Sequence, residues 1–178
     1  MTNPLEEHLE IHRIATAAFK VVRRVLDHRT NPLSNTQFYG KSQEEVNEML
    51  DLAEKAVSAL VAFAIFAAFE RTLRDHLSKN LDAFESSSTT PAELAGSLSR
   101  FLADGVDYWR VGHVIDLFSP PALDQDVRNA KTIRDYRNRV AHGKTPPPAI
   151  PPTKAHSQLV GFLRNAGLVA QAAEKKVE

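Results

Sequence analysis

The chain of 178 residues contains no cysteine. This absence excludes a disulfide framework, a cysteine-based zinc site and a thiol nucleophile, and it fits a reducing compartment, so we expect a cytoplasmic protein. Net charge is also absent, because 22 Lys and Arg residues balance 22 Asp and Glu residues. No global field therefore draws the molecule toward nucleic acid or membrane, and any anion-binding site must come from local clustering.

Long hydrophobic stretches are equally scarce. The longest runs from Ala56 to Phe69, interrupted only by Ser58, and its 14 residues fall short of the roughly 20 that a membrane-spanning helix needs. We expect this run to form a helix buried on all sides at the centre of a bundle, with no membrane partner. The segment Met1–Leu9 carries Glu6, Glu7 and His8 and lacks the apolar core of a signal peptide.

Strand-like alternation is nearly absent, and the apolar residues recur at steps of three and four. The pattern predicts an all-α, compact bundle of about five helices with a long central helix, folded as one domain over residues 1–178. The expected helices cover residues 5–28, 43–81, 90–106, 123–142 and 154–175, and 108–118 is a candidate for a separate short helix. Residues 145–152 are proline-rich and predict an extended linker before the last helix.

The boundaries of three helices have recognisable signals. Ser42 followed by Glu45 predicts a capping box at the start of the long helix. Thr90 followed by Pro91 has the composition of a helix start. Gly143 is well placed to end the helix that precedes it.

Positive charge is concentrated in residues 128–144. This segment contains six basic residues and a single acid, Asp135. The basic residues are Arg128, Lys131, Arg134, Arg137, Arg139 and Lys144. In a neutral chain such a local excess is the kind of patch that attracts phosphates.

Helical geometry sorts the side chains of this segment. Ile133, Tyr136 and Val140 share one face and should point to the core. Asn138 and His142 are four residues apart and therefore neighbours, whereas Arg137 lies about 140° around an ideal helix from His142. Arg137 and His142 can share a pocket only at a distorted helix end, or if a partner surface closes over them.

Arg137, Asn138 and His142 together suit cleavage of an RNA phosphodiester. The histidine can move a proton at the 2′-hydroxyl or the leaving oxygen, and the arginine can hold the phosphate and stabilise its charge. The asparagine can orient the histidine or bind a phosphate oxygen. Four further basic residues are candidates for RNA binding: Lys131, Arg134, Arg139 and Lys144. This chemistry needs neither a metal nor a cofactor, and we predict none.

The run Arg137-Asn138-Arg139-Val140-Ala141-His142 resembles the Arg-x4-6-His signature of HEPN domains. The resemblance implies a helical bundle whose active members are metal-independent endoribonucleases of toxin–antitoxin and defence systems. It also implies a homodimer with two motifs in one composite cleft, and an antitoxin protein as a further partner. The stretch Phe69-Glu70 and Leu73-Arg74 is similar to a segment of the RiboL-PSP-HEPN subfamily.

Two other functions remain open. Some HEPN-like proteins are non-catalytic modules that bind a nucleotide, RNA or a partner protein, and the motif could also be incidental in a helical interaction protein. Outside the motif we expect ordinary structural roles. Glu70 and Arg74 have the spacing of a helix-stabilising pair, and His113 near Trp109 should be a packing residue. The acidic run 44–54 should be a solvated face or meet a basic partner surface.

Overall fold

The computed structural model describes residues 3–27, 36–87, 102, 105–106, 108–118, 123–143 and 148–169. Within these residues the chain forms five helices and no strand. The helices are α1 (Glu6–Asp27), α2 (Gln43–Ser87), α4 (Val111–Leu117), α5 (Asp124–Ala141) and α6 (Pro152–Asn165). The predicted all-α fold with a long helix is confirmed, whereas most of the helix expected over residues 90–106 lies outside the described residues.

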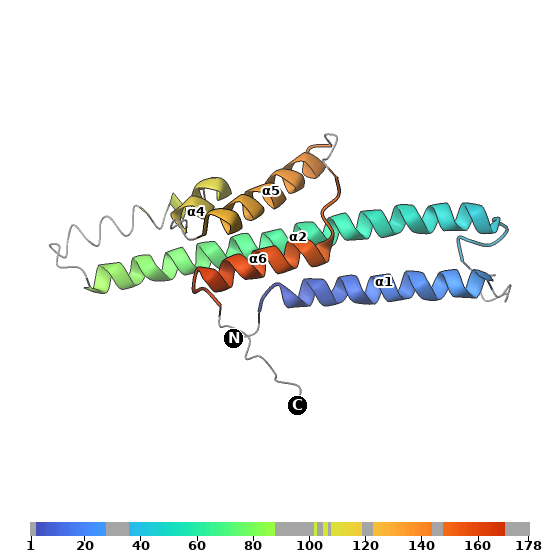
Figure 1. The fold of residues 1–178 in the computed structure, drawn as a ribbon, viewed down its shortest axis with the longest axis horizontal. Coiled ribbons are helices and arrows are strands. Elements are labelled where there is room, and N and C mark those ends of the chain that lie inside the picture. The colour runs from blue at the N-terminus through green and yellow to red at the C-terminus, as the bar shows by residue number, and fades with distance from the viewer. Residues whose placement is uncertain are drawn as a thin grey trace, which may run out of the picture.

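The long helix α2 organises the bundle (Figure 1). Helices α1 and α5 flank it on opposite sides in this view, α4 lies beside α5, and α6 crosses in front of α2. The main core forms where α2, α5 and α6 meet. Phe69 of α2 and Phe162 of α6 are both fully buried, and their rings pack edge to face at 5.3 Å between centroids. Aromatic pairs in this geometry add to the stabilisation that burial alone provides.

The predicted capping box at the start of α2 is confirmed. The Ser42 backbone N–H donates to Glu45 Oε2 at 2.7 Å, and the Glu45 backbone N–H donates to Ser42 Oγ at 3.2 Å. The two residues thus satisfy each other's backbone donors at the helix end, where no intrahelical acceptor exists. Donation from Ser42 also lowers the pKa of the Glu45 carboxyl.

The C-terminal ends of α5 and α6 both use glycine. Gly143 has a φ of +61° and follows the last turn of α5, as predicted. The last helix, expected over residues 154–175, ends already at Asn165. There the Gly167 N–H donates to the Arg164 carbonyl and the Leu168 N–H to the Leu163 carbonyl, which is the Schellman arrangement with glycine in the left-handed conformation. The expected continuation to 175 is therefore wrong up to Val169, and residues 170–178 lie outside the described residues.

The expectation that the apolar run of α2 is buried on all sides is wrong. Val61, Ile65 and Phe69 face the core, but Leu60 is 69% exposed and Ala56 and Ala67 are exposed as well. Because a helix places residues 56, 60, 63, 64 and 67 on one face, this apolar face is left partly uncovered, with Phe63 and Ala64 half-buried. By length and composition, α2 is the one helix in the described residues that could cross a membrane, although core helices of soluble proteins pass the same test.

The acidic face of α2 is partly covered by α1. Arg23 of α1 donates to Asp51 at 2.6 Å and to Glu54 at 2.9 Å. This face was expected to be solvated or, as the alternative, to meet a basic surface of a partner. Part of a basic contact is supplied by the same chain. His12 adds a polar contact between the two helices, with its Nε2 atom 3.3 Å from Ser58 Oγ.

Candidate functional site

Helix α5 directs Arg137 toward α2. Ile133 and Tyr136 are buried in the core, as predicted, and this anchoring turns the next residue, Arg137, against the side of α2. Its guanidinium lies over the Phe63 ring at 5.0 Å and near the Phe66 ring at 5.8 Å from the ring centroids. Both contacts are cation–π interactions, which hold a guanidinium in place without neutralising its charge.

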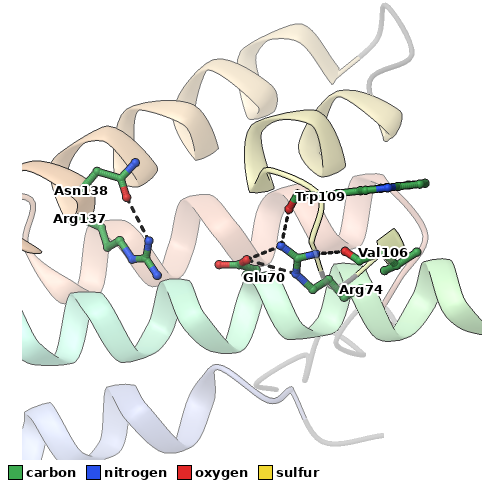
Figure 2. A network of polar contacts seen from close by, with 6 residues as sticks. All are labelled: Glu70, Arg74, Val106, Trp109, Arg137 and Asn138. Carbon is green, nitrogen blue, oxygen red and sulfur yellow. Dashed lines mark hydrogen bonds and ion pairs between the residues drawn. The ribbon is translucent and has the colours of Figure 1, made fainter. Parts of the chain in front are cut away.

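Asn138 fixes the other end of the same guanidinium. Arg137 Nη1 donates to Asn138 Oδ1 at 3.0 Å (Figure 2). Arg137 Nε is buried and has no hydrogen-bond partner among the described residues. A buried charged donor without a partner is costly unless a ligand or water satisfies it. Arg137 is thus positioned by neutral groups and keeps its positive charge.

Arg137 and Asn138 open onto a cleft between α4 and α5. Its volume is about 490 Å³, within the range of about 300–1,000 Å³ typical of small-molecule sites. The charged and polar residues that line it are Arg110, His113, Asp116, Arg134, Asp135, Arg137 and Asn138. Val111 and Gly112 complete the lining. Three arginines thus converge on one cleft, although the whole chain carries no net charge.

The two carboxylates of the cleft are engaged by basic residues of α5. Asp135 accepts from Arg134 Nε at 2.9 Å and Nη2 at 2.7 Å, and Asp116 pairs with Lys131 Nζ at 2.5 Å. Arg110 and Arg137 have no carboxylate partner among the described residues. Local potential in the cleft is therefore positive, which favours a phosphate or carboxylate ligand.

Gly112 brings α4 close to α5. A Cβ atom at this position would collide with Arg134 Nη1, so the guanidinium of Arg134 lies directly against the backbone of α4. A larger residue at position 112 would therefore displace the end of the Arg134 side chain. The contact holds Arg134 at the floor of the cleft.

The remaining predicted site residues lie elsewhere. His142 is exposed and follows α5 directly, with its backbone N–H donating to the Asn138 carbonyl at 3.1 Å. It does not line the cleft, and the side chain of Asn138 bonds to Arg137 and not to His142. Arg139 is exposed, Lys131 is paired with Asp116, and Lys144 lies outside the described residues. Within one chain, Arg134, Arg137 and Asn138 therefore line the same cleft, whereas His142 lies just after the C-terminal end of α5.

A second polar network lies next to Arg137 in Figure 2. Arg74 Nη2 pairs with Glu70 Oε1 at 2.7 Å, which confirms the predicted helix pair. Arg74 also donates to the carbonyls of Val106 and Trp109. The carboxylate of Glu70 lies between the guanidinium groups of Arg137 and Arg74 in this view. Arg74 thereby ties the segment before α4 to α2 and positions the far wall of the cleft.

Two residues of the cleft were not predicted as functional. Arg110 and His113 are exposed and reach the cleft from α4 and its N-terminal flank. The expected packing role of His113 is wrong, because Val114 and Ile115 are the residues by which α4 enters the core. Arg110 is the N-cap residue of α4, and His113 lies in the first turn of this helix. Nothing in the local sequence, however, distinguishes that pair from an ordinary solvated face.

Comparison of the chain with family models, with curated proteins and with solved structures gives no match in any of the three.

Proposed function

We propose that the protein is a metal-independent endoribonuclease of the HEPN type that cleaves single-stranded RNA and acts as a toxin or defence protein. The observation that carries the proposal is the placement of Arg137. Its guanidinium is held by Phe63 and Asn138, lines the cleft and has no carboxylate partner among the described residues. That arrangement is suited to clamp a phosphate and to stabilise charge that develops on it.

His142 supplies the proton transfer. In the proposed reaction the ribose 2′-oxygen attacks phosphorus, the bond from phosphorus to the 5′-oxygen breaks, and a 2′,3′-cyclic phosphate forms. One imidazole takes the proton of the 2′-hydroxyl, and an imidazolium gives a proton to the departing 5′-oxygen. These steps need two proton carriers at one phosphate, and a single chain has one His142, which does not line its own cleft.

A second copy of the chain supplies the other His142 in this proposal. One face of α2, here named the α2 apolar face, consists of three exposed residues, Ala56, Leu60 and Ala67, and two half-buried ones, Phe63 and Ala64. It borders the site directly, because Phe63 carries the guanidinium of Arg137. A contiguous exposed apolar patch is typical of an interface.

In this proposal a two-fold axis at Leu60, which is 69% exposed, places α2 antiparallel to its copy. The apolar faces of the two copies then cover each other.

The direct test is incubation of a mixed RNA in EDTA with the wild type and with His142→Ala. We expect the wild type to cut the RNA and leave cyclic phosphate ends, and the variant to lose at least about 100-fold in rate. His142 is exposed, so the melting temperature should not change. Equal cleavage by the variant would overturn the assignment. Absence of cleavage by a folded, dimeric wild type would favour the alternative function, a non-catalytic HEPN-like module that binds a nucleotide, RNA or a partner protein such as an antitoxin.

A further inference from the structure

We infer that Arg110 and His113 form a phosphate-binding subsite for the backbone of single-stranded RNA, separate from the Arg-x4-His motif. The inference deepens the proposed function, on which it rests for the identity of the ligand as RNA. Both residues line the cleft between α4 and α5 together with Arg134 and Arg137. Neither belongs to the basic segment 128–144 in which the motif lies.

The two ends of the cleft differ in how their cations are held. At the α5 side, Arg137 is half-buried and fixed by aromatic rings and Asn138. At the α4 side, Arg110 and His113 are exposed, and Arg110 has no ion-pair partner in the described part of the chain. A fixed guanidinium suits the phosphate that reacts, whereas exposed and adaptable donors suit a neighbouring phosphate of the same strand.

Arg134 connects the two ends. Two of its nitrogens are engaged by Asp135, and the third lies against Gly112, between Arg110 and His113 in the sequence. The neutralised Arg134–Asp135 pair forms a floor, and the charge of the cleft comes from Arg110 and Arg137 on either side of it. Two separated cations in a cleft of about 490 Å³ favour two phosphates of one strand over a single phosphate group.

The backbone of RNA fits this cleft better than its bases do. Arg110, His113 and Arg137 offer N–H donors, which bind phosphate oxygens without reading sequence. Trp109 is half-buried and is not among the lining residues. No Phe, Tyr or Trp side chain of the described residues therefore lines the cleft as a platform for stacking a base. We therefore expect the subsite to raise affinity for RNA of any sequence.

The test measures binding of a fluorescent, uncleavable 2′-O-methyl oligonucleotide at several salt concentrations. Loss of one phosphate contact on a single strand reduces the slope of log K against log salt by about 0.7. We expect Arg110→Gln to reduce the slope by about that amount and to weaken binding. We expect His113→Ala to weaken binding as well. Lys20→Gln is the matched control, because it removes one exposed charge from α1 and should leave the slope unchanged.

Gly112→Ala gives an independent check. The added methyl group displaces the end of the Arg134 side chain, while alanine is the better helix former by about 1 kcal/mol. The variant should fold and bind the oligonucleotide more weakly than the wild type. Unchanged affinity and slope in Arg110→Gln would overturn the subsite, as would a nucleoside monophosphate that binds as tightly as the oligonucleotide.

Failure of the subsite and failure of the nuclease are distinguishable. If Arg110→Gln binds like the wild type while RNA cleavage still depends on His142, the subsite is wrong and the nuclease stands. If binding depends on Arg110 but no RNA is cut, the subsite stands and the nuclease is wrong. Because the oligonucleotide has no free 2′-hydroxyl, the binding measurement does not depend on turnover.

Discussion

The guanidinium of Arg137 lies over the ring of Phe63, 5.0 Å from its centroid. The contact joins the motif-bearing helix α5 to the apolar face of α2. It places the proposed phosphate clamp at the edge of the proposed dimer interface. The clamp and the interface are therefore expected to depend on each other.

Arg137→Lys should lower cleavage by at least about tenfold without unfolding the protein. Lysine keeps the charge but loses the planar group that stacks on Phe63 and binds a phosphate through two nitrogens. Phe63→Leu should lower cleavage less, because it keeps the guanidinium and removes only its support. The measurement is kcat and KM on one RNA, with melting curves for both variants. A fully active lysine variant would contradict the clamp.

Leu60→Glu should convert the proposed dimer to a monomer. The substitution places a charge at the centre of the α2 apolar face, directly opposite its own copy, where like charges repel and lose water. Size determination in solution tests it, with Lys55→Glu on the same helix as the control. A wild type that is already monomeric would exclude a second copy as the partner. Binding of that monomer to lipid vesicles would identify a membrane surface as what covers this face.

Arg74→Met should destabilise the fold by about 2–3 kcal/mol, the range for hydrogen bonds to a charged group that are lost in a partly buried place. The side chains of Arg74 and Glu70 are only 16% and 21% exposed, and the substitution leaves Glu70 and two backbone carbonyls without their donor. Chemical denaturation measures the change. Arg71→Met, an exposed neighbour on α2, should change stability by less than about 0.5 kcal/mol. Equal effects of the two variants would show that the network contributes nothing specific.

His156 should make the protein less stable in mild acid. Burial lowers the pKa of its imidazole below the ordinary 6.5, although Glu6, 3.1 Å away, acts in the opposite direction. The unfolded chain therefore takes up a proton before the folded chain does, so the contribution of His156 is complete above pH 6.5 and is lost as the pH falls below that value. The difference in unfolding free energy between pH 7.5 and pH 5.5 should be smaller in His156→Gln than in the wild type. An equal difference in both proteins would contradict this assignment.

Local signals in the sequence determined much of the fold. The steps of three and four set the helices, Ser42 and Glu45 set the start of α2, and Gly143 set the end of α5, because each depends on residues within one or two turns. The early end of α6 at Gly167 had a local signal too, but the apolar residues beyond it favoured a longer helix.

Only the tertiary structure decided which side chains share a site. The sequence identified Arg137, Asn138 and His142 as one group, but the packing of α5 turned Arg137 against Phe63 and left His142 exposed. The packing of α4 on α5 brought Arg110 and His113 into the cleft, about 25 residues from the motif along the chain, a distance over which helix periodicity carries no information. The exposed face of α2 could not be predicted for the same reason, because it too depends on how distant helices pack. Hydrophobicity along the chain shows that a helix can be buried. The number of helices that pack around it decides which of its faces are in fact buried.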